Sequence, residues 1–226
     1  MQMRNVGRFD KHKTYKNKFF NYDVAIMFVT KEFELTSLIR PICLEGPSEG
    51  ETPSSGAAVT VSGWGKDLVG GGGTQMKSVS LQVADTRYCR NTLNKRYEEN
   101  GAFGEDLFCA DDTAGSTSGT CHGDSGGPMV ALKASELRFV LKGIVQGGEA
   151  CGAYNSPDVF TSTNFGPIYN WIVRKVNACS NGHLECTNGE DLLKLFIHYE
   201  TVDIIKKNLF FWYLILIHKY PKLIMQ

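Results

Sequence analysis

One eight-residue string, Cys121 to Pro128 (CHGDSGGP), constrains this chain more than any other stretch. In it Ser125 stands between glycines and directly follows an aspartate. Glycine adopts backbone angles that are closed to other residues and lets another chain come close. The turn is therefore a candidate oxyanion hole, whose amides point at a reacting carbonyl. A Gly-Ser surface turn beside a structural cysteine is the alternative for the bare Gly-Asp-Ser triplet, but the full string is more specific.

The composition indicates a disulfide-bearing β protein. A chain of 226 residues suffices for one domain with a substantial core, or for two small barrels. Its 24 basic and 24 acidic residues balance, so the charge indicates no nucleic-acid or membrane-surface partner. Seven cysteines and 24 glycines favour a loop-rich, secreted extracellular protein. Residues 1–10 contain no apolar signal-peptide core, and a truncated chain would reconcile the two observations.

The order of apolar and polar runs predicts strands, a linker and a terminal helix. Residues 21–29 form an apolar run that predicts a buried strand, with Asp23 at its entrance, where an aspartate is usually a turn or cap residue. Residues 44–57 are rich in Gly, Pro, Ser and Glu, contain almost nothing to bury, and predict a linker. Apolar residues at helical spacing after Pro167 predict a helix over 167–176. Six short runs suit a small antiparallel barrel, namely 58–62, 79–83, 106–110, 128–133, 137–146 and 158–163.

In combination these motifs resemble the chymotrypsin/trypsin family of serine endopeptidases. The string around Ser125 resembles the family's nucleophile loop, residues 40–44 (RPICL) follow an Asp23-containing strand as in the family, and residues 62–65 (SGWG) match a strand start. The resemblance covers about residues 6–179. It implies an all-β fold, a double antiparallel β-barrel with a closing C-terminal helix. The expected division is a remnant of an incomplete first barrel (1–45), a linker (46–57), the second barrel with its helix (58–178) and an unmatched tail (179–226).

The resemblance also implies catalytic roles. Ser125 would be the nucleophile, the amides of Gly123 and Ser125 the oxyanion hole, and Asp23 the carboxylate that orients a histidine base. The family carries that base in an Ala-Ala-His-Cys string before the aspartate, and this chain has none. His12 is expected to be a surface histidine, and His122 to lie at the pocket rim. Loss of one triad member leaves only about 10³–10⁴-fold catalysis over water.

Asp124 is implied in a second family feature, the activation ion pair. There a cleaved Ile or Val amino terminus folds inward and pairs with the aspartate before the nucleophile. The chain starts past that point, so Asp124 is expected to be a carboxylate without its cation, at a cost of several kcal/mol. We therefore expect the chain as given to be inactive.

The substrate pocket departs from the family pattern. Gly119 aligns with the base position that holds aspartate in trypsin-like members, whereas Asp158 replaces a glycine of the opposite wall. A carboxylate there could still bind Arg or Lys in altered geometry, and a solvated turn aspartate is the alternative. The strand that usually reads Ser-Trp-Gly is changed too. The implied substrate-binding residues are Asp158, Gly119, Thr120, His122, Gln146, Gly147 and Gly148.

The resemblance implies two disulfides, Cys89–Cys109 and Cys121–Cys151. Each would stabilise the fold by roughly 2–4 kcal/mol. Cys43 matches a position that some members link to a regulatory segment, which would be a disulfide-linked partner. Cys179 and Cys186 either pair locally or stay reduced.

The remaining segments suggest no cofactor. Residues 70–73 are four glycines without a Lys-Ser/Thr ending, so they predict a turn and no phosphate site; we expect neither a cofactor nor a metal. The apolar run at 209–217 is about half of the roughly 20 residues that a spanning helix needs. Contact with a membrane or another chain, and non-native sequence, are the two interpretations of this tail, and we favour the second.

We therefore predict a secreted serine endopeptidase that cuts a protein or peptide substrate after Arg or Lys. The alternative is a non-catalytic homologue that acts as a binding or regulatory module. Gln146, Gly147 and Gly119 favour the alternative, whereas the intact loop around Ser125 and Asp23 favour the enzyme.

Overall fold

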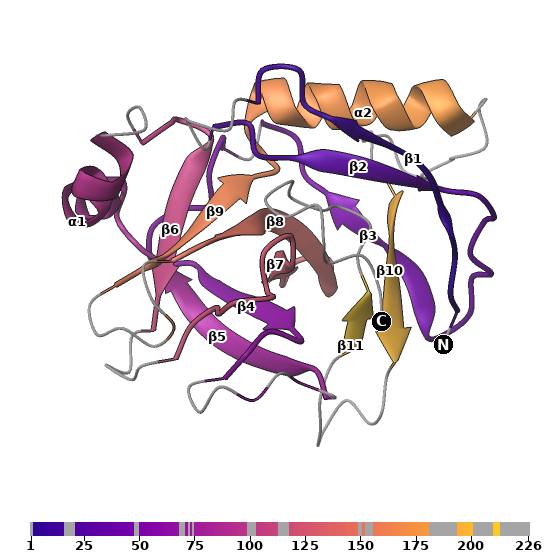
Figure 1. Ribbon diagram of the computed structural model, residues 1–226, viewed down its shortest axis with the longest axis horizontal. Helices are drawn as coiled ribbons and strands as arrows, with labels where there is room; N and C mark the ends of the chain where they lie inside the picture. Colours follow the sequence, from indigo (N-terminus) through magenta and orange to yellow (C-terminus); the bar gives the residue numbers. More distant parts are fainter. Residues whose placement is uncertain are drawn as a thin grey trace.

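A closed antiparallel barrel forms the centre of the structure, which is a computed structural model (Figure 1). The structure describes residues 2–15, 21–47, 50–67, 71, 73, 75–98, 103–112, 118–148, 151, 156–180, 194–200 and 210–212. The barrel strands follow the order β8-β7-β4-β5-β6-β9, and β9 pairs again with β8 to close the ring. These strands are β4 (Ala58–Gly63), β5 (Lys77–Val83), β6 (Leu107–Asp111), β7 (Pro128–Lys133), β8 (Arg138–Gly147) and β9 (Asp158–Ser162).

The six predicted barrel strands are thus confirmed, with ends that differ by one or two residues. Alternating side chains of β4 and β5 point inward, which is the period of two that a half-buried strand requires. Phe108 and Phe160 stack inside the barrel with ring centroids 5.6 Å apart. The Phe108 ring and the Phe160 Cβ fill the space beside Gly143, where an added Cβ would lie 2.7 Å from Phe108.

The segment before the barrel forms three strands that do not close among the residues described. β1 (Val6–Lys11) pairs with β2 (Ala25–Val29) as a two-stranded antiparallel ribbon. β3 (Ile39–Leu44) belongs to the other sheet, where it pairs in parallel with β8 and Cys43 lies opposite Val140. The expected incomplete first barrel agrees with this arrangement.

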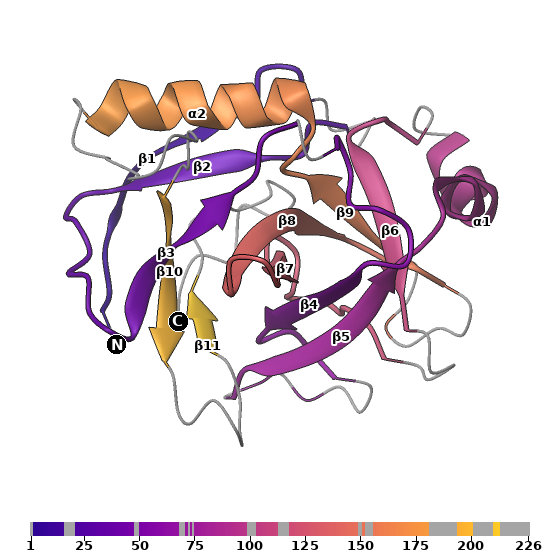
Figure 2. The same cartoon turned by 180° about the vertical axis from the view of Figure 1, so that it is seen from behind.

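The predicted terminal helix is α2 (Gly166–Ser180), which lies along β1 and β2 in Figure 1 and in the reverse view of Figure 2. Pro167 stands in its first turn, where the missing amide proton costs nothing. Ile168, Trp171 and Ile172 are buried and pack against residues of β2 and β3. Burial of each such side chain contributes about 1.5–3 kcal/mol, so this stripe joins the helix to the first unit.

A second helix, α1 (Thr86–Glu98), was not predicted. Asp85 caps it, because its Oδ1 accepts hydrogen bonds from the amides of Arg87 and Tyr88 at 2.8 and 3.2 Å. Cys89 and Leu93 lie one turn apart and are fully buried. This i, i+4 pair after an aspartate is the signal that could have indicated the helix.

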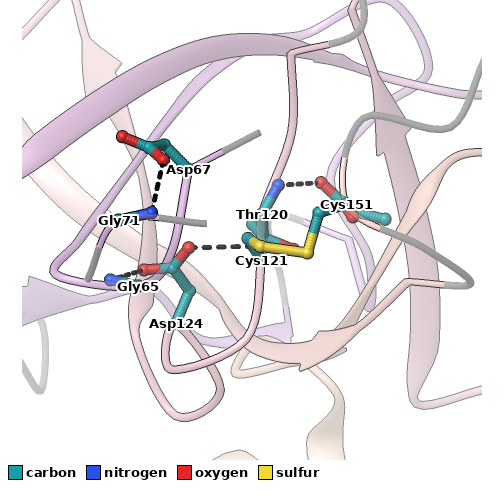
Figure 3. Close-up of a disulfide and its surroundings, with 8 residues drawn as sticks. Gly65, Asp67, Gly71, Thr120, Cys121, Asp124 and Cys151 are labelled. Atoms are coloured by element: carbon teal, nitrogen blue, oxygen red, sulfur yellow. Dashed lines mark hydrogen bonds between the residues drawn. A yellow bond between two sulfur atoms is a disulfide. The ribbon is translucent and has the colours of Figure 1, made fainter. Parts of the chain in front are cut away.

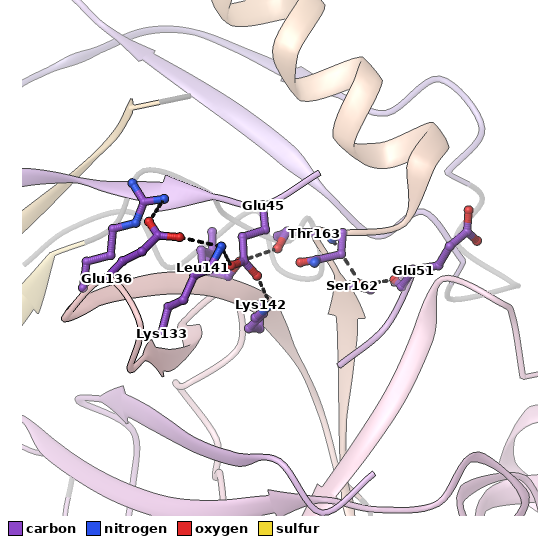
Figure 4. Close-up of polar contacts among 10 residues, drawn as sticks. Glu45, Glu51, Lys133, Glu136, Leu141, Lys142, Ser162 and Thr163 are labelled. Carbon is purple, nitrogen blue, oxygen red and sulfur yellow. Dashed lines mark hydrogen bonds and ion pairs between the residues drawn. The ribbon is translucent and has the colours of Figure 1, made fainter. Parts of the chain in front are cut away.

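The first two residues of the Gly- and Pro-rich run 44–57 are buried, and both precede the predicted linker at 46–57. Leu44 and Glu45 are buried, so the expectation that residues 44–57 have almost nothing to bury is wrong at these two positions. Glu45 contacts Lys142 and lies 3.3 Å from the Nζ of Lys133, and Lys133 pairs with Glu136 at 2.6 Å (Figure 4). Burial alone would raise the pKa of Glu45, but hydrogen bonds and charge from Lys142 and Lys133 lower it. The network fastens the end of β3 to the β7–β8 hairpin.

Two strands of the tail extend the sheet beyond β3. β10 (Lys194–Glu200) pairs antiparallel with β3, and β11 (Phe210–Trp212) pairs with β10. The rest of the apolar run at 209–217 lies outside the described residues. Within the described part of the chain, no helix has the length and apolar character that crossing a membrane requires.

Candidate active site

The turn that carries Ser125 lies between residues 118–121 and the start of β7 at Pro128. Ser125 is exposed, and its neighbours are fastened to β8, because the amide of Gly126 donates to the Val145 carbonyl and the Val145 amide donates to Gly127, both at 2.8 Å. Gly123 and Gly126 have φ angles of +102° and +86°. Only glycine adopts such angles without strain, so these two positions shape the turn.

The Asp124 side chain holds the turn through hydrogen bonds to Gly65 and Cys121 (Figure 3). Its Oδ1 accepts a hydrogen bond from the Gly65 amide at 2.8 Å, and its Oδ2 accepts one from the Cys121 amide at 2.9 Å. An added Cβ on Gly63 or Gly65 would overlap the carboxylate, which explains why both positions of the Ser-Gly-Trp-Gly string are glycine. Burial raises the pKa of Asp124, while the two amides and the charge of Lys77 oppose the rise.

A cavity of about 210 Å³ opens beside the Asp124 carboxylate. Its walls come from the end of β4, the start of β5 and residues 118–121. Two lysines, Lys66 and Lys77, also line it, and the Nζ of Lys77 lies 2.5 Å from Asp67 Oδ2. The Asp124 carboxylate and two lysines thus line the same cavity.

Both disulfides implied by the sequence are present. Cys121–Cys151 joins the serine turn to residue 151, which also lines the cavity beside Asp124, and Cys89–Cys109 joins α1 to β6. The half-buried Cys43 has its Sγ 3.5 Å from Arg138 Nη1. The side chains of Cys179 and Cys186 lie outside the described residues.

Asp158 fills the space between Gly119 and Gly148. It is 7% exposed, so the interpretation as a solvated turn aspartate is wrong. Its Oδ2 accepts a hydrogen bond from the Thr120 amide at 2.6 Å. An added Cβ would lie 2.8 Å from Oδ2 at Gly119 and 2.6 Å from Oδ1 at Gly148. Burial raises the pKa of Asp158 to about 6, and the charges of Asp111 and Asp124 add to the rise.

The end of β8 carries Gln146 and Gly147. Gln146 is buried, and Gly147 has a φ of +143° with nothing within 4 Å of an added Cβ. An added side chain at Gly147 would therefore meet open space.

Asp23 is buried, with 1% exposure, at the centre of a three-residue turn closed by the Val24 amide and the Tyr22 carbonyl at 2.8 Å. Tyr15 lies within its field: burial and the charge of Asp23 raise the pKa of Tyr15 to about 12. The carboxylate is thus buried close enough to Tyr15 for its charge to act on the phenol.

His12 is not a surface histidine, which corrects the prediction. It is 5% exposed, stacks on Tyr22 with centroids 4.8 Å apart and meets Trp171 edge-on at 5.1 Å. Its Nδ1 accepts a weak hydrogen bond from the Thr14 amide at 3.3 Å. Burial, with the charges of Lys13 and Arg174, lowers the pKa of His12. These contacts describe a neutral packing residue.

The other histidines add no base to this arrangement among the described side chains. His122 is exposed, and its carbonyl accepts a hydrogen bond from the Lys66 amide at 2.8 Å. The side chains of His183, His198 and His218 lie outside the described residues. No group of three or more His, Cys, Asp or Glu within the described chain could hold a metal ion.

A closed antiparallel barrel with a serine in a glycine-rich turn at its edge defines a class, the β-barrel serine proteases. Residues 1–172 match the family model described as Trypsin, and the chain belongs to this family.

Curated relatives agree with this assignment. The chain is 31% identical over 180 residues to "Phenoloxidase-activating factor 2" of Galleria mellonella, which covers 77% of the chain and 57% of the relative. It is 32% identical over 176 residues to "Transmembrane protease serine 7" of Rattus norvegicus, covering 76% of the chain and 20% of the relative. "Suppressor of tumorigenicity 14 protein homolog" of Bos taurus is 29% identical over 178 residues, covering 78% and 19%. The chain thus spans only part of the length of these relatives.

Proposed function

We propose that this chain is a serine endopeptidase domain in which Ser125 is the nucleophile. The observation that carries the proposal is that Ser125 is exposed in a fixed turn. The turn is held by the Asp124 hydrogen bonds, by the hydrogen bonds to Val145 and by the Cys121–Cys151 disulfide. A fixed turn holds backbone donors in place before charge develops on the substrate, which is the main source of rate enhancement in such sites.

The proposed reaction begins with attack of the Ser125 Oγ on the scissile carbonyl carbon. The serine proton passes to an imidazole base, and the carbonyl oxygen becomes an oxyanion that faces the amides of Gly123 and Ser125. Each such donor is typically worth about 2.7–4 kcal/mol. The base then gives the proton to the leaving amine, and water hydrolyses the acyl-enzyme in the same way.

We propose that Asp23 orients and electrostatically supports that base. The printed sequence has no histidine at the family's position, and His12 is engaged in aromatic packing with Tyr22 and Trp171. The chain alone is therefore expected to lack turnover, and an added imidazole should restore part of the chemistry, because it would supply the base that the proposed nucleophile needs.

Asp158 supports a preference for Arg or Lys before the cut. Its buried carboxylate fills the space between Gly119 and Gly148, so we propose that a basic side chain pairs with this negative charge after displacing part of that packing. The pairing requires the ionised form, and the pKa of Asp158 is about 6, so ligand binding is expected to weaken below that pH.

Further parts of the proposal concern activation and organisation. We propose that the cavity beside Asp124 accepts an ammonium group, which would satisfy this half-buried carboxylate. We propose residues 1–45, 46–57, 58–178 and 179–226 as the units of the chain, an extracellular location because disulfides persist there, and Cys43 as the link to a regulatory segment.

The test is labelling of the 226-residue chain with a fluorophosphonate, read by intact mass and peptide mapping. The Ser125 oxygen forms a bond to phosphorus, fluoride leaves, and the proton goes to the base. We expect no labelling of the chain alone and labelling at Ser125 with millimolar imidazole. Strong labelling without imidazole would contradict the need for an external base, and none in either case would favour the non-catalytic homologue. A Ser125→Ala variant is the control.

A further inference from the structure

Asp106 contacts the turn that carries Asp23, although Asp106 precedes the barrel strand β6 and Asp23 precedes β2. It directly precedes β6 of the barrel and is 2% exposed. Its Oδ2 accepts a hydrogen bond from the Tyr22 amide at 2.6 Å, a contact between residues 84 positions apart. A short bond between a backbone amide and a buried carboxylate is stronger than a neutral bond, so it is a firm tie between the units.

The turn that receives this tie needs external support. Tyr22 has a φ of +54°, which is an unfavourable angle for a bulky residue. The Val24 amide closes the turn on the Tyr22 carbonyl, with Asp23 at its centre. Strained conformations of this kind persist only where surrounding contacts hold them. The amide of Tyr22 is the backbone group next to Asp23 that the barrel holds directly.

Asp106 is itself fixed by the barrel. Its carbonyl accepts a hydrogen bond from the Ser162 amide at 2.7 Å, at the end of β9. The Ser162 hydroxyl in turn donates to the Glu51 carbonyl at 2.6 Å (Figure 4). The side-chain oxygens of Asn21 and Asp106 also converge on Gly104, where an added Cβ would overlap both. Two hydrogen bonds, from the Ser162 amide to Asp106 and from the Tyr22 amide to Asp106, thus connect β9 to the turn that contains Asp23.

The ionisation of Asp106 fits this role. Burial raises its pKa to about 6, and the Tyr22 amide opposes the rise, while Glu105 faces it with like charge. Near pH 7 the carboxylate is therefore ionised, and the Tyr22 amide supplies the strongest stabilisation described for it.

We propose that Asp106 is a positioning residue for Asp23: it holds the Tyr22 amide, and so keeps the Asp23 carboxylate at one buried place relative to the barrel that carries Ser125. The role of Asp106 in holding the Tyr22 amide does not depend on any activity, whereas its effect on catalysis rests on the proposed function.

The experiment is native-state hydrogen exchange of the 226-residue chain, followed by NMR at the amides of Tyr22 and Val24. Asp106→Asn keeps a neutral acceptor and Asp106→Ala removes it. We expect protection at both amides to fall about threefold in the first variant and about tenfold or more in the second, with barrel amides such as Val145 unchanged. Equal loss at all amides, or none at Tyr22 and Val24, would overturn the proposal. If Asp106→Ala does not fold, Asp106→Asn decides it by the same criterion.

A matched control and a second readout complete the test. Asp85→Ala also removes a carboxylate that accepts backbone amides, and it is expected to lower protection in α1 only. In imidazole-dependent labelling of Ser125, the Asp106 variants should need more imidazole for the half-maximal rate, with unchanged reagent affinity. If the wild-type chain never labels, the proposed function fails while the exchange result still decides the role of Asp106.

Discussion

The Oδ1 atom of Asp124 accepts a hydrogen bond from the amide of Gly65, 2.8 Å away and 59 residues earlier in the chain. This bond joins the serine turn to the end of β4, so two sequence motifs that are far apart form one unit. The carboxylate occupies the space that a side chain at residue 65 would need. The glycines of one motif are therefore required by the aspartate of the other.

The first prediction concerns that contact. In Gly65→Ala an added Cβ would lie 2.5 Å from both Asp124 oxygens, so the carboxylate or the strand must move. We expect a loss of about 1–3 kcal/mol in the free energy of unfolding, measured by urea denaturation, and loss of imidazole-dependent labelling of Ser125. Gly46→Ala is the control, because its Cβ would lie 3.5 Å from Tyr169, an ordinary contact. Equal stability of the two variants would contradict the prediction.

The second prediction separates the two disulfides. They close loops of 30 and 20 residues, so replacing both cysteines of either pair by serine should cost about 3–4 kcal/mol in each case. Only removal of Cys121–Cys151 should also abolish labelling of Ser125, because that bridge is attached to the serine turn. Removal of Cys89–Cys109 serves as the matched control, and a similar loss of labelling in both would show that general destabilisation is the cause.

The barrel and its closing helix could be predicted because their signals are local. Alternating apolar residues, turn residues between them and an apolar stripe at helical spacing need no knowledge of distant contacts. β1 escaped prediction because nearly all of its residues are exposed and show no alternation. α1 escaped because its buried face rests on only Cys89 and Leu93 among the described side chains.

The sequence motifs predicted which residues form the candidate site, but they did not predict which of its side chains are buried. The burial of Asp158 depends on Gly119 and Gly148, which lie far from it in the sequence. Likewise, His12 is buried by Tyr22 and Trp171, and no local pattern indicates that these rings meet. Side-chain environments of this kind arise only from tertiary packing.

The third prediction concerns the pH dependence of stability. The folded-state pKa of Asp158 is about 6 against an ordinary value of 3.8, so its contribution to stability is complete below about pH 3.8 and is lost as the pH rises to about 6. Two pKa units correspond to about 3 kcal/mol. The stability of Asp158→Asn relative to wild type should therefore improve by up to about 3 kcal/mol between pH 4 and pH 7, measured by urea denaturation. Because Asp106 and Asp124 are present in both proteins, a constant difference would refute the assignment.

The fourth prediction concerns His12, whose lowered pKa has the opposite consequence. Protonation of the buried ring favours the unfolded chain, so its contribution to stability is complete above the ordinary pKa of 6.5 and is lost as the pH falls towards the lower folded-state value. His12→Phe keeps a ring against Tyr22 and Trp171 but cannot be protonated. We expect the stability of wild type relative to this variant to fall between pH 7 and pH 5 in urea denaturation. Lys13→Met, which removes one of the nearby charges and leaves the ring, should reduce this acid sensitivity without abolishing it. A wild-type chain that loses no more stability than His12→Phe over this range would show that the histidine is already protonated, or is reached by water, in the folded state.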